Sequence, residues 1–208
     1  MKSRYFFYTV SLGTFLFVSC TSSNTKNNEH EENNMNDSTE HTASTNDADI
    51  KTVGVIYTNI DATAAASVKL IVDHYLHIKN ALANDNAEEA ANGGKAMAEA
   101  VKKVDKSLFT AEQKKAYDEI TSELQDHGEH VAKNAKDIKH QRSHFILMSE
   151  DMYSLVKTFG AGLPLYHDHC PMANDNKGAM WISEMKEIKN PYFGASMLTC
   201  GSVEEVIQ

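Results

Sequence analysis

Hydrophobic and polar residues in the middle of the chain recur with the period of an α-helix. Over residues 62–83 the apolar side chains stand three or four positions apart, which places them on one face of a helix. These residues are Val68, Ile71, Tyr75, Ile78 and Leu82. The spacing predicts an amphipathic helix whose apolar face is buried.

Three further stretches have the same period. The second covers about 87–105, the third begins at Thr110, and the fourth covers about 137–159. Thr110 stands three residues before Gln113, the spacing of a capping box at a helix start. No proline interrupts residues 1–163. We therefore predict an all-α fold, an antiparallel four-helix bundle with short connections.

The last 45 residues have a different pattern, since they hold all three prolines and several turn signals. We expect an irregular C-terminal tail that packs on the bundle through Trp181, Tyr192 and Phe193. Residues 51–58 are consistent with a short extended strand or an ordered lead-in, and no sheet is expected from them.

The N-terminus has the features of an export signal. In residues 1–19 two basic residues precede an apolar run over 5–18, shorter than the roughly 20 residues that span a bilayer. Ser19 followed by Cys20 resembles a bacterial lipoprotein cleavage box, which predicts lipidation of Cys20; the alternative is a secretory signal with a chance cysteine. The polar residues 20–50 predict a disordered tether. Either alternative places the domain in an oxidising compartment, and lipidation would anchor it to a membrane leaflet facing the periplasm.

Composition narrows the classes of function. The chain has 20 Lys and Arg against 29 Asp and Glu, a net charge of −9. This charge argues against a nucleic-acid binder or a polybasic membrane-surface module. The chain shows no nucleophile–base motif, CxxC pair or phosphate loop, so we do not expect an enzyme. Its 10 His and 9 Met point instead to metal ions.

The candidate metal ligands gather in residues 166–201 of a domain that covers 51–208. Soft thiolate and thioether ligands favour Cu(I), with imidazole as a compatible partner, whereas zinc has little use for methionine. We predict a Cu(I) site in this segment. Its sulfur ligands would be Cys170, Met172, Met197 and Cys200, and its nitrogen alternatives His169, His167 and, from the fourth helix, His144.

A disulfide is the competing interpretation of the same cysteines. If Cys20 is lipidated, Cys170 and Cys200 are the remaining pair. A ring of about 30 residues would stabilise the fold by roughly 3.5 kcal/mol in the chain-entropy model. The protein would then be a structural or interaction module of the cell envelope without a metal.

The predicted helices also carry histidine pairs. Residues three or four positions apart share one helix face, so such a pair can chelate a metal ion, but ten histidines also produce such spacings by chance. Met148 and Met152 would extend the last pair into a ladder, although they also fit the apolar face of the fourth helix. The pairs are His74 and His77, His127 and His130, and His140 and His144.

Three segments resemble a known family. They read CPMANDNKGAMW, NPYFGASMLTCG and HQRSHFILMSEDMYSLVK. They are similar to an exported bacterial domain of unknown function that also forms the C-terminus of periplasmic adaptors of copper/silver efflux pumps, over about residues 60–205. The resemblance implies a helical domain, a role in heavy-metal handling, and an efflux adaptor or other envelope protein as partner. It implies no established reaction.

Overall fold

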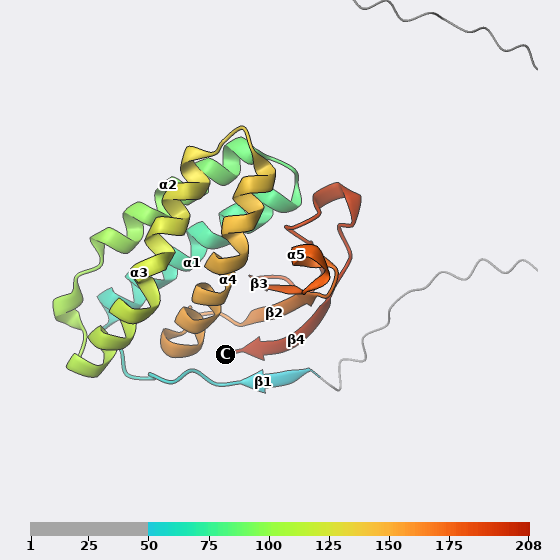
Figure 1. Cartoon of the computed structure of the whole chain (residues 1–208). Coiled ribbons are helices and arrows are strands. Elements are labelled where there is room, and N and C mark those ends of the chain that lie inside the picture. Colours follow the sequence, from blue (N-terminus) through green and yellow to red (C-terminus); the bar gives the residue numbers. More distant parts are fainter. Residues whose placement is uncertain (1–49) are drawn as a thin grey trace, which may run out of the picture. The chain divides into compact units, whose positions relative to one another are not determined.

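A computed structural model describes residues 50–208 of the chain (Figure 1). The predicted signal peptide (1–19), the proposed lipidation site Cys20 and nearly all of the predicted tether (20–50) lie outside the described residues.

Four long helices form the larger part of the fold, and each packs against the next (Figure 1). The Asp61 carboxylate accepts a hydrogen bond from the Thr63 amide at the start of the first helix, and Thr110 and Gln113 form the predicted capping box. The predicted helical bundle is confirmed. None of the described helices is long and apolar enough to cross a membrane. The helices are α1 (Ala62–Ala83), α2 (Ala87–Lys103), α3 (Ala111–Lys133) and α4 (Ile138–Phe159).

The C-terminal part contains a four-stranded sheet in the order β1-β4-β2-β3. β1 runs parallel to β4, and the other pairs are antiparallel. The prediction of an all-α fold with an irregular tail is therefore wrong for this part of the chain. The strands are β1 (Lys51–Val53), β2 (Leu165–Cys170), β3 (Ala179–Ser183) and β4 (Ser202–Ile207), and the short helical turns are η2 (Lys106–Leu108), α5 (Ala173–Asn176) and η3 (Gly194–Ser196).

The strands lack the sequence signals that the helices have. β2 and β3 have six and five residues, and β2 reads LYHDHC, with a buried carboxyl group at Asp168. β1 pairs with β4 across about 150 residues, with Lys51 opposite Glu205. Such a pairing depends on tertiary structure, because local propensity in strands is weak and depends on context.

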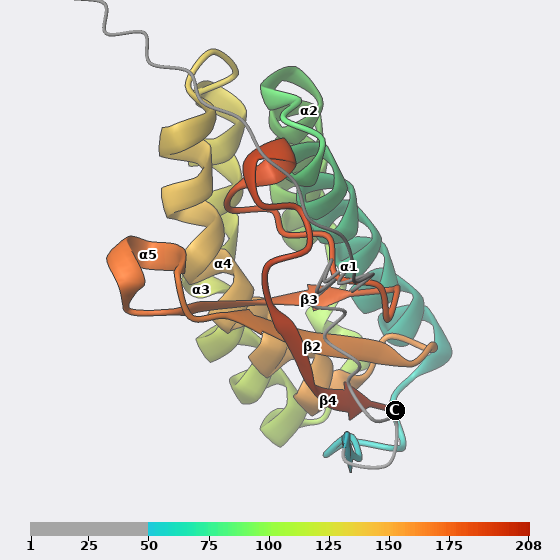
Figure 2. The same cartoon turned by 90° about the vertical axis from the view of Figure 1, so that its right-hand side faces the viewer.

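The sheet packs against α1 and α4 (Figure 2). Trp181 on β3 is fully buried, and its ring meets Tyr192 edge-on at a centroid distance of 5.8 Å. Tyr192 lies 5.9 Å from Phe145 of α4, which stacks on Tyr75 of α1 at 5.0 Å. Aromatic pairs at these distances contribute beyond their buried area. The tail and the helices thus share one hydrophobic core.

Candidate metal centre

The sheet brings the two cysteines of the domain together. Cys170 is the last residue of β2, and Cys200 stands two residues before Ser202, which opens β4 and pairs with His169 of β2. The two Sγ atoms lie 3.0 Å apart, and both thiols are free. Cys170 is fully buried, while Cys200 is partly exposed. Cysteines 30 residues apart in sequence therefore form a single thiol pair.

The distance between the Cys170 and Cys200 sulfurs lies between the value for a disulfide and the value for two thiolates on one metal ion. A disulfide has an S–S length of about 2.0 Å, and two thiolates on a tetrahedral ion with bonds of about 2.3 Å stand about 3.8 Å apart. The hydrogen bond between Cys200 and Cys170, followed by burial, raises the pKa of Cys200 to about 11. The Cys200 thiol is therefore protonated at neutral pH, and a bound metal ion must displace its proton.

Two methionines lie on the turns that flank the thiol pair. Met172 follows Pro171 at the start of α5, and Met197 follows η3. Both line an open pocket of about 480 Å³. The Cys200 amide donates a hydrogen bond of 3.1 Å to the Met197 carbonyl. Met172 is 47% exposed, so its thioether is free to move toward a ligand in this pocket.

Buried polar groups hold the loop that carries Met197 and Cys200. Asn190 is fully buried, and its Nδ2 donates a hydrogen bond of 2.7 Å to the Cys200 carbonyl. Its Oδ1 accepts one of 2.8 Å from the Tyr192 amide. Arg142 of α4 donates from Nε to the Pro191 carbonyl at 2.8 Å. These bonds tie the two ends of the loop to each other and hold its start against α4.

Asp85, which follows α1, forms a clamp on this loop together with Arg142. Asp85 accepts a hydrogen bond from Arg142 Nη2 at 2.6 Å and another from the Ala195 amide at 2.9 Å. These two donors, the amide first, lower the pKa of Asp85. Gly194 has a φ of +55°, and a Cβ there would lie 2.2 Å from Asp85 Oδ1. A glycine is therefore required where the loop meets the carboxylate.

The clamp residues Asp85 and Arg142 are not among the site residues predicted from sequence. One signal could have found Arg142, since it is the only arginine after Arg4 in a chain that otherwise uses lysine. A guanidinium offers several donors in a rigid fork, whereas an ammonium is a compact point charge. Arg142 uses this fork to reach the Leu82 carbonyl as well, at 2.8 Å.

The tail histidines lie on the other side of β2 from the buried thiol. Successive strand residues point to opposite faces, and His167 and His169 alternate with the buried Asp168 and Cys170. His169 Nδ1 stands 3.3 Å from a carboxylate oxygen of Glu204 on β4. The structure therefore groups both histidines with acidic side chains of β4 rather than with the thiol pair.

His144, the third predicted nitrogen ligand, belongs to a different group of side chains. Its Nδ1 lies 3.3 Å from Nδ1 of His127 on α3. Its ring stacks on that of His130 with 4.4 Å between centroids and 11° between planes. Burial first, then the neighbouring His130, His140 and His127, lower the pKa of His144 to about 4. The structure thus joins the histidine pairs of α3 and α4 into one cluster.

Met148, Met152 and Met180, three other methionines near these groups, pack in or against the core. Met148 and Met152 of α4 are fully buried, so they form part of the core rather than a ladder with the histidines. Met180 on β3 is partly buried against the same core. Met185, just after β3, is also partly buried.

One buried acid lies close to the thiol pair in sequence. Asp168 stands two residues before Cys170, and burial raises the pKa of its carboxyl to about 8, against the opposing effect of Lys79. The carboxyl is therefore protonated at neutral pH. Lys79 is fully buried, and its ammonium group donates a hydrogen bond of 2.8 Å to Glu184 rather than to Asp168.

The fold and the site together define a four-helix bundle with a C-terminal sheet and a thiol pair at one end of β2. Residues 71–162 match a family described as "Protein of unknown function (DUF3347)". This range runs from within α1 to just past α4, so the helical part of the chain is similar to that family, and the thiol pair lies outside the matched range. No curated protein and no solved structure matches this chain.

Proposed function

We propose that this chain is an exported, lipid-anchored heavy-metal-binding protein that holds Cu(I) or Ag(I) and acts in copper handling or efflux, without a catalytic role. The observation that carries the proposal is the thiol pair. Cys170 and Cys200 lie 3.0 Å apart, and Met172 and Met197, two and three residues from them in sequence, line one pocket.

The chemistry of these donors selects the ion. Thiolates bind both Cu(I) and Zn²⁺, and the thioethers, which are not usual zinc ligands, shift the preference of the site to Cu(I). Thiolates from Cys170 and Cys200, with thioethers from Met172 and Met197, offer four sulfur donors. Asn190 holds the Cys200 carbonyl and Arg142 holds the Pro191 carbonyl, so binding does not have to order this loop.

The cellular context of the proposal comes from the sequence. The apolar N-terminal segment and Cys20 support export and lipid anchoring at a membrane facing the periplasm. The tail resembles the C-terminal domain of copper/silver efflux adaptors, which supports an efflux adaptor or another envelope protein as the partner. As a flexible linker, the polar residues 20–50 would allow the domain to extend away from its lipid anchor.

A second candidate function rests on the same sulfur atoms. Cys170 and Cys200 stand about 1 Å beyond disulfide bonding distance. In an oxidising compartment they would close with little movement of the backbone. The protein would then be a disulfide-stabilised interaction module of the envelope.

Competition for Cu(I) against a chromogenic chelator under reducing conditions tests the metal site. Because the thiolates supply the strongest ligands, the Cys170→Ser/Cys200→Ser variant should bind Cu(I) at least about 100-fold more weakly than the parent. Met172→Leu and Met197→Leu should each have a smaller effect. A double cysteine variant that binds Cu(I) as tightly as the parent would contradict the proposal.

Two controls accompany this titration. Met180→Leu and Met185→Leu remove thioethers that are partly buried beside the thiol-bearing sheet, and both should retain the parent affinity for Cu(I). Intact mass measurements of the non-reduced protein distinguish the second candidate function. A mass lower by two hydrogens, with no copper adduct after reduction and loading, would assign the cysteines to a disulfide.

A further inference from the structure

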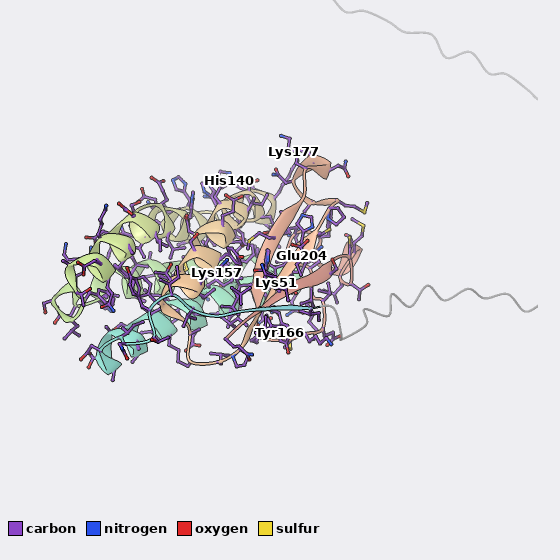
Figure 3. All side chains as sticks on the ribbon, turned by 90° about the horizontal axis from the view of Figure 1, so that it is seen from below. Lys51, His140, Lys157, Tyr166, Lys177 and Glu204 are labelled. Carbon is purple, nitrogen blue, oxygen red and sulfur yellow. The ribbon has the colours of Figure 1, made fainter. Side chains whose placement is uncertain are left out.

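A second group of metal-ligating side chains lies on the helices. His130 stands in the last turn of α3, and His140 and His144 stand in the first two turns of α4. One ligand nitrogen from each of the three lies within 4.8 Å of the others. His130 and His140 are exposed, and His144 is partly buried. Figure 3 shows His140 at the edge of the helices, apart from Glu204 on the sheet.

The connection between the helices explains why these residues meet. α3 ends at Lys133 and α4 begins at Ile138, so the four-residue turn makes the two helices antiparallel neighbours. Residues just before the turn then face residues just after it. His140 and His144 are one helical turn apart and share a face, and this face lies against His130.

The separations suit an ion after small side-chain rotations. An ion with tetrahedral bonds of about 2.0–2.1 Å places ligand nitrogens about 3.4 Å apart. To shorten the separations between the ligand nitrogens from 4.8 Å to about 3.4 Å, each nitrogen must move by less than about 1 Å toward a common centre. The exposed rings of His130 and His140 have the freedom to make this movement.

His127 lies next to the cluster and contacts His144, one of its three histidines. Nδ1 of His127 and Nδ1 of His144 lie within hydrogen-bond distance, at 3.3 Å. If His144 donates through Nδ1, its Nε2 carries a lone pair for an ion. Metal-binding histidines commonly donate their second nitrogen to such a partner.

Acidic side chains of α3 act on the histidine next to the cluster. The carboxylates of Glu123 and Asp126 act electrostatically on His127. Lys133, three residues after His130, forms an ion pair with Glu129 at 3.1 Å.

We propose that His130, His140 and His144 form a second metal site, for a divalent first-row transition ion, with His127 as the positioning residue for His144. Imidazole nitrogens suit copper, zinc and nickel, and Cu²⁺ binds most tightly among the divalent ions of this row. The site is chemically distinct from the sulfur site, which favours a monovalent soft ion. It stands whether or not the cysteines bind a metal.

Titration with Cu²⁺, followed by electron paramagnetic resonance, tests this site in the mature chain. Cys170→Ser and Cys200→Ser are present in every sample, so failure of the sulfur site does not affect the outcome. The tether histidines, His30 and His41, are retained throughout and therefore contribute equally. The parent should bind one Cu²⁺ tightly, with a spectrum that shows several nitrogen ligands.

The decisive variant carries His130→Asn, His140→Asn and His144→Asn and should bind Cu²⁺ at least about 100-fold more weakly. The matched control is His74→Asn/His77→Asn, which removes a histidine pair of similar spacing from α1 and should leave the affinity unchanged. An unchanged affinity in the triple variant, or an equal loss in the control, would overturn the proposal.

Two single variants guard against loss of structure. His140 is exposed, so His140→Asn should keep the helical circular dichroism and still weaken Cu²⁺ binding about tenfold. His127→Phe should also weaken binding about tenfold while the spectrum keeps the same number of nitrogen ligands. A His127→Phe spectrum with one nitrogen fewer would make His127 a ligand and overturn its role as a positioning residue.

Discussion

At the scale of single residues, the seam between α3 and α4 contains an unusual carboxyl group. Asp151 lies on α4 and is partly buried. Burial, followed by the like charges of Glu123 and Glu150, raises its pKa to about 6. The folded state therefore holds a proton that the unfolded state releases at lower pH, which makes this position sensitive to pH.

We expect Asp151→Asn to become increasingly stable relative to the parent as pH rises from about 4 to about 6. The folded-state pKa is raised, so between 3.8 and about 6 the native state binds more protons than the unfolded state, and the stability of the parent falls with pH. Asparagine does not titrate. After allowance for solvent screening the gain should reach about 1 kcal/mol. Urea unfolding at several pH values measures it, and a difference that is constant with pH would contradict the assignment.

At the scale of elements, two glycines set how closely α2 and α3 pack. A Cβ on Gly94 would lie 2.7 Å from the Gly128 carbonyl oxygen, and a Cβ on Gly128 would lie 3.0 Å from the Gly94 carbonyl oxygen. Each glycine costs about 1 kcal/mol of helix propensity relative to alanine. The close contact of the two backbones explains why these helices contain glycines in their interiors.

Gly94→Ala should lower the free energy of unfolding by about 2 kcal/mol, even though alanine favours helix, because the added methyl group meets a backbone atom that cannot turn aside. Chemical denaturation provides the measurement. Gly54→Ala is the control, since no atom lies within 4 Å of a Cβ at that position, and it should change stability by less than about 0.5 kcal/mol. A Gly94→Ala variant as stable as the parent would mean that the helices separate without cost.

At the scale of the whole molecule, the sheet and the bundle share their core. Trp181, Ile182 and Tyr192 from the C-terminal part are buried in the same cluster as Tyr75 and the apolar face of α4. The family match covers 71–162 and thus only the helices of this joint structure. The tail therefore contributes to the stability of the helices as well as carrying the thiol pair.

A chain truncated after Gly160 should keep a helical circular dichroism spectrum, because the capped helices lie entirely before this point. Its melting temperature should fall by at least about 10 °C, since removal of Trp181 and Tyr192 exposes the sheet-facing side of the bundle. Thermal melts of the two chains make the comparison. An unchanged melting temperature would show that the tail adds nothing to the helical core, and a random-coil spectrum would show that the helices need it to fold.

The sequence by itself determined the helices and the residues with ligand chemistry. The bounds of α1 and α4 were predicted from the apolar period and from the glycines that follow Phe159. The start of α3 was predicted from Thr110 and Gln113, since a cap depends on residues three positions apart. Helical signals are readable because each turn interacts with its own neighbours along the chain.

The tertiary structure alone decided which chemical groups meet. It pairs β1 with β4 across the length of the domain and places the Cys170 and Cys200 sulfurs 3.0 Å apart. His144, which was predicted as a ligand of the sulfur site, instead lies in a helical cluster with His130. Strand pairing brings distant segments together, and the alternation along β2 then turns His169 away from the buried thiol. The type of a residue determines what its side chain can bind, but long-range packing determines which side chains can bind the same ligand.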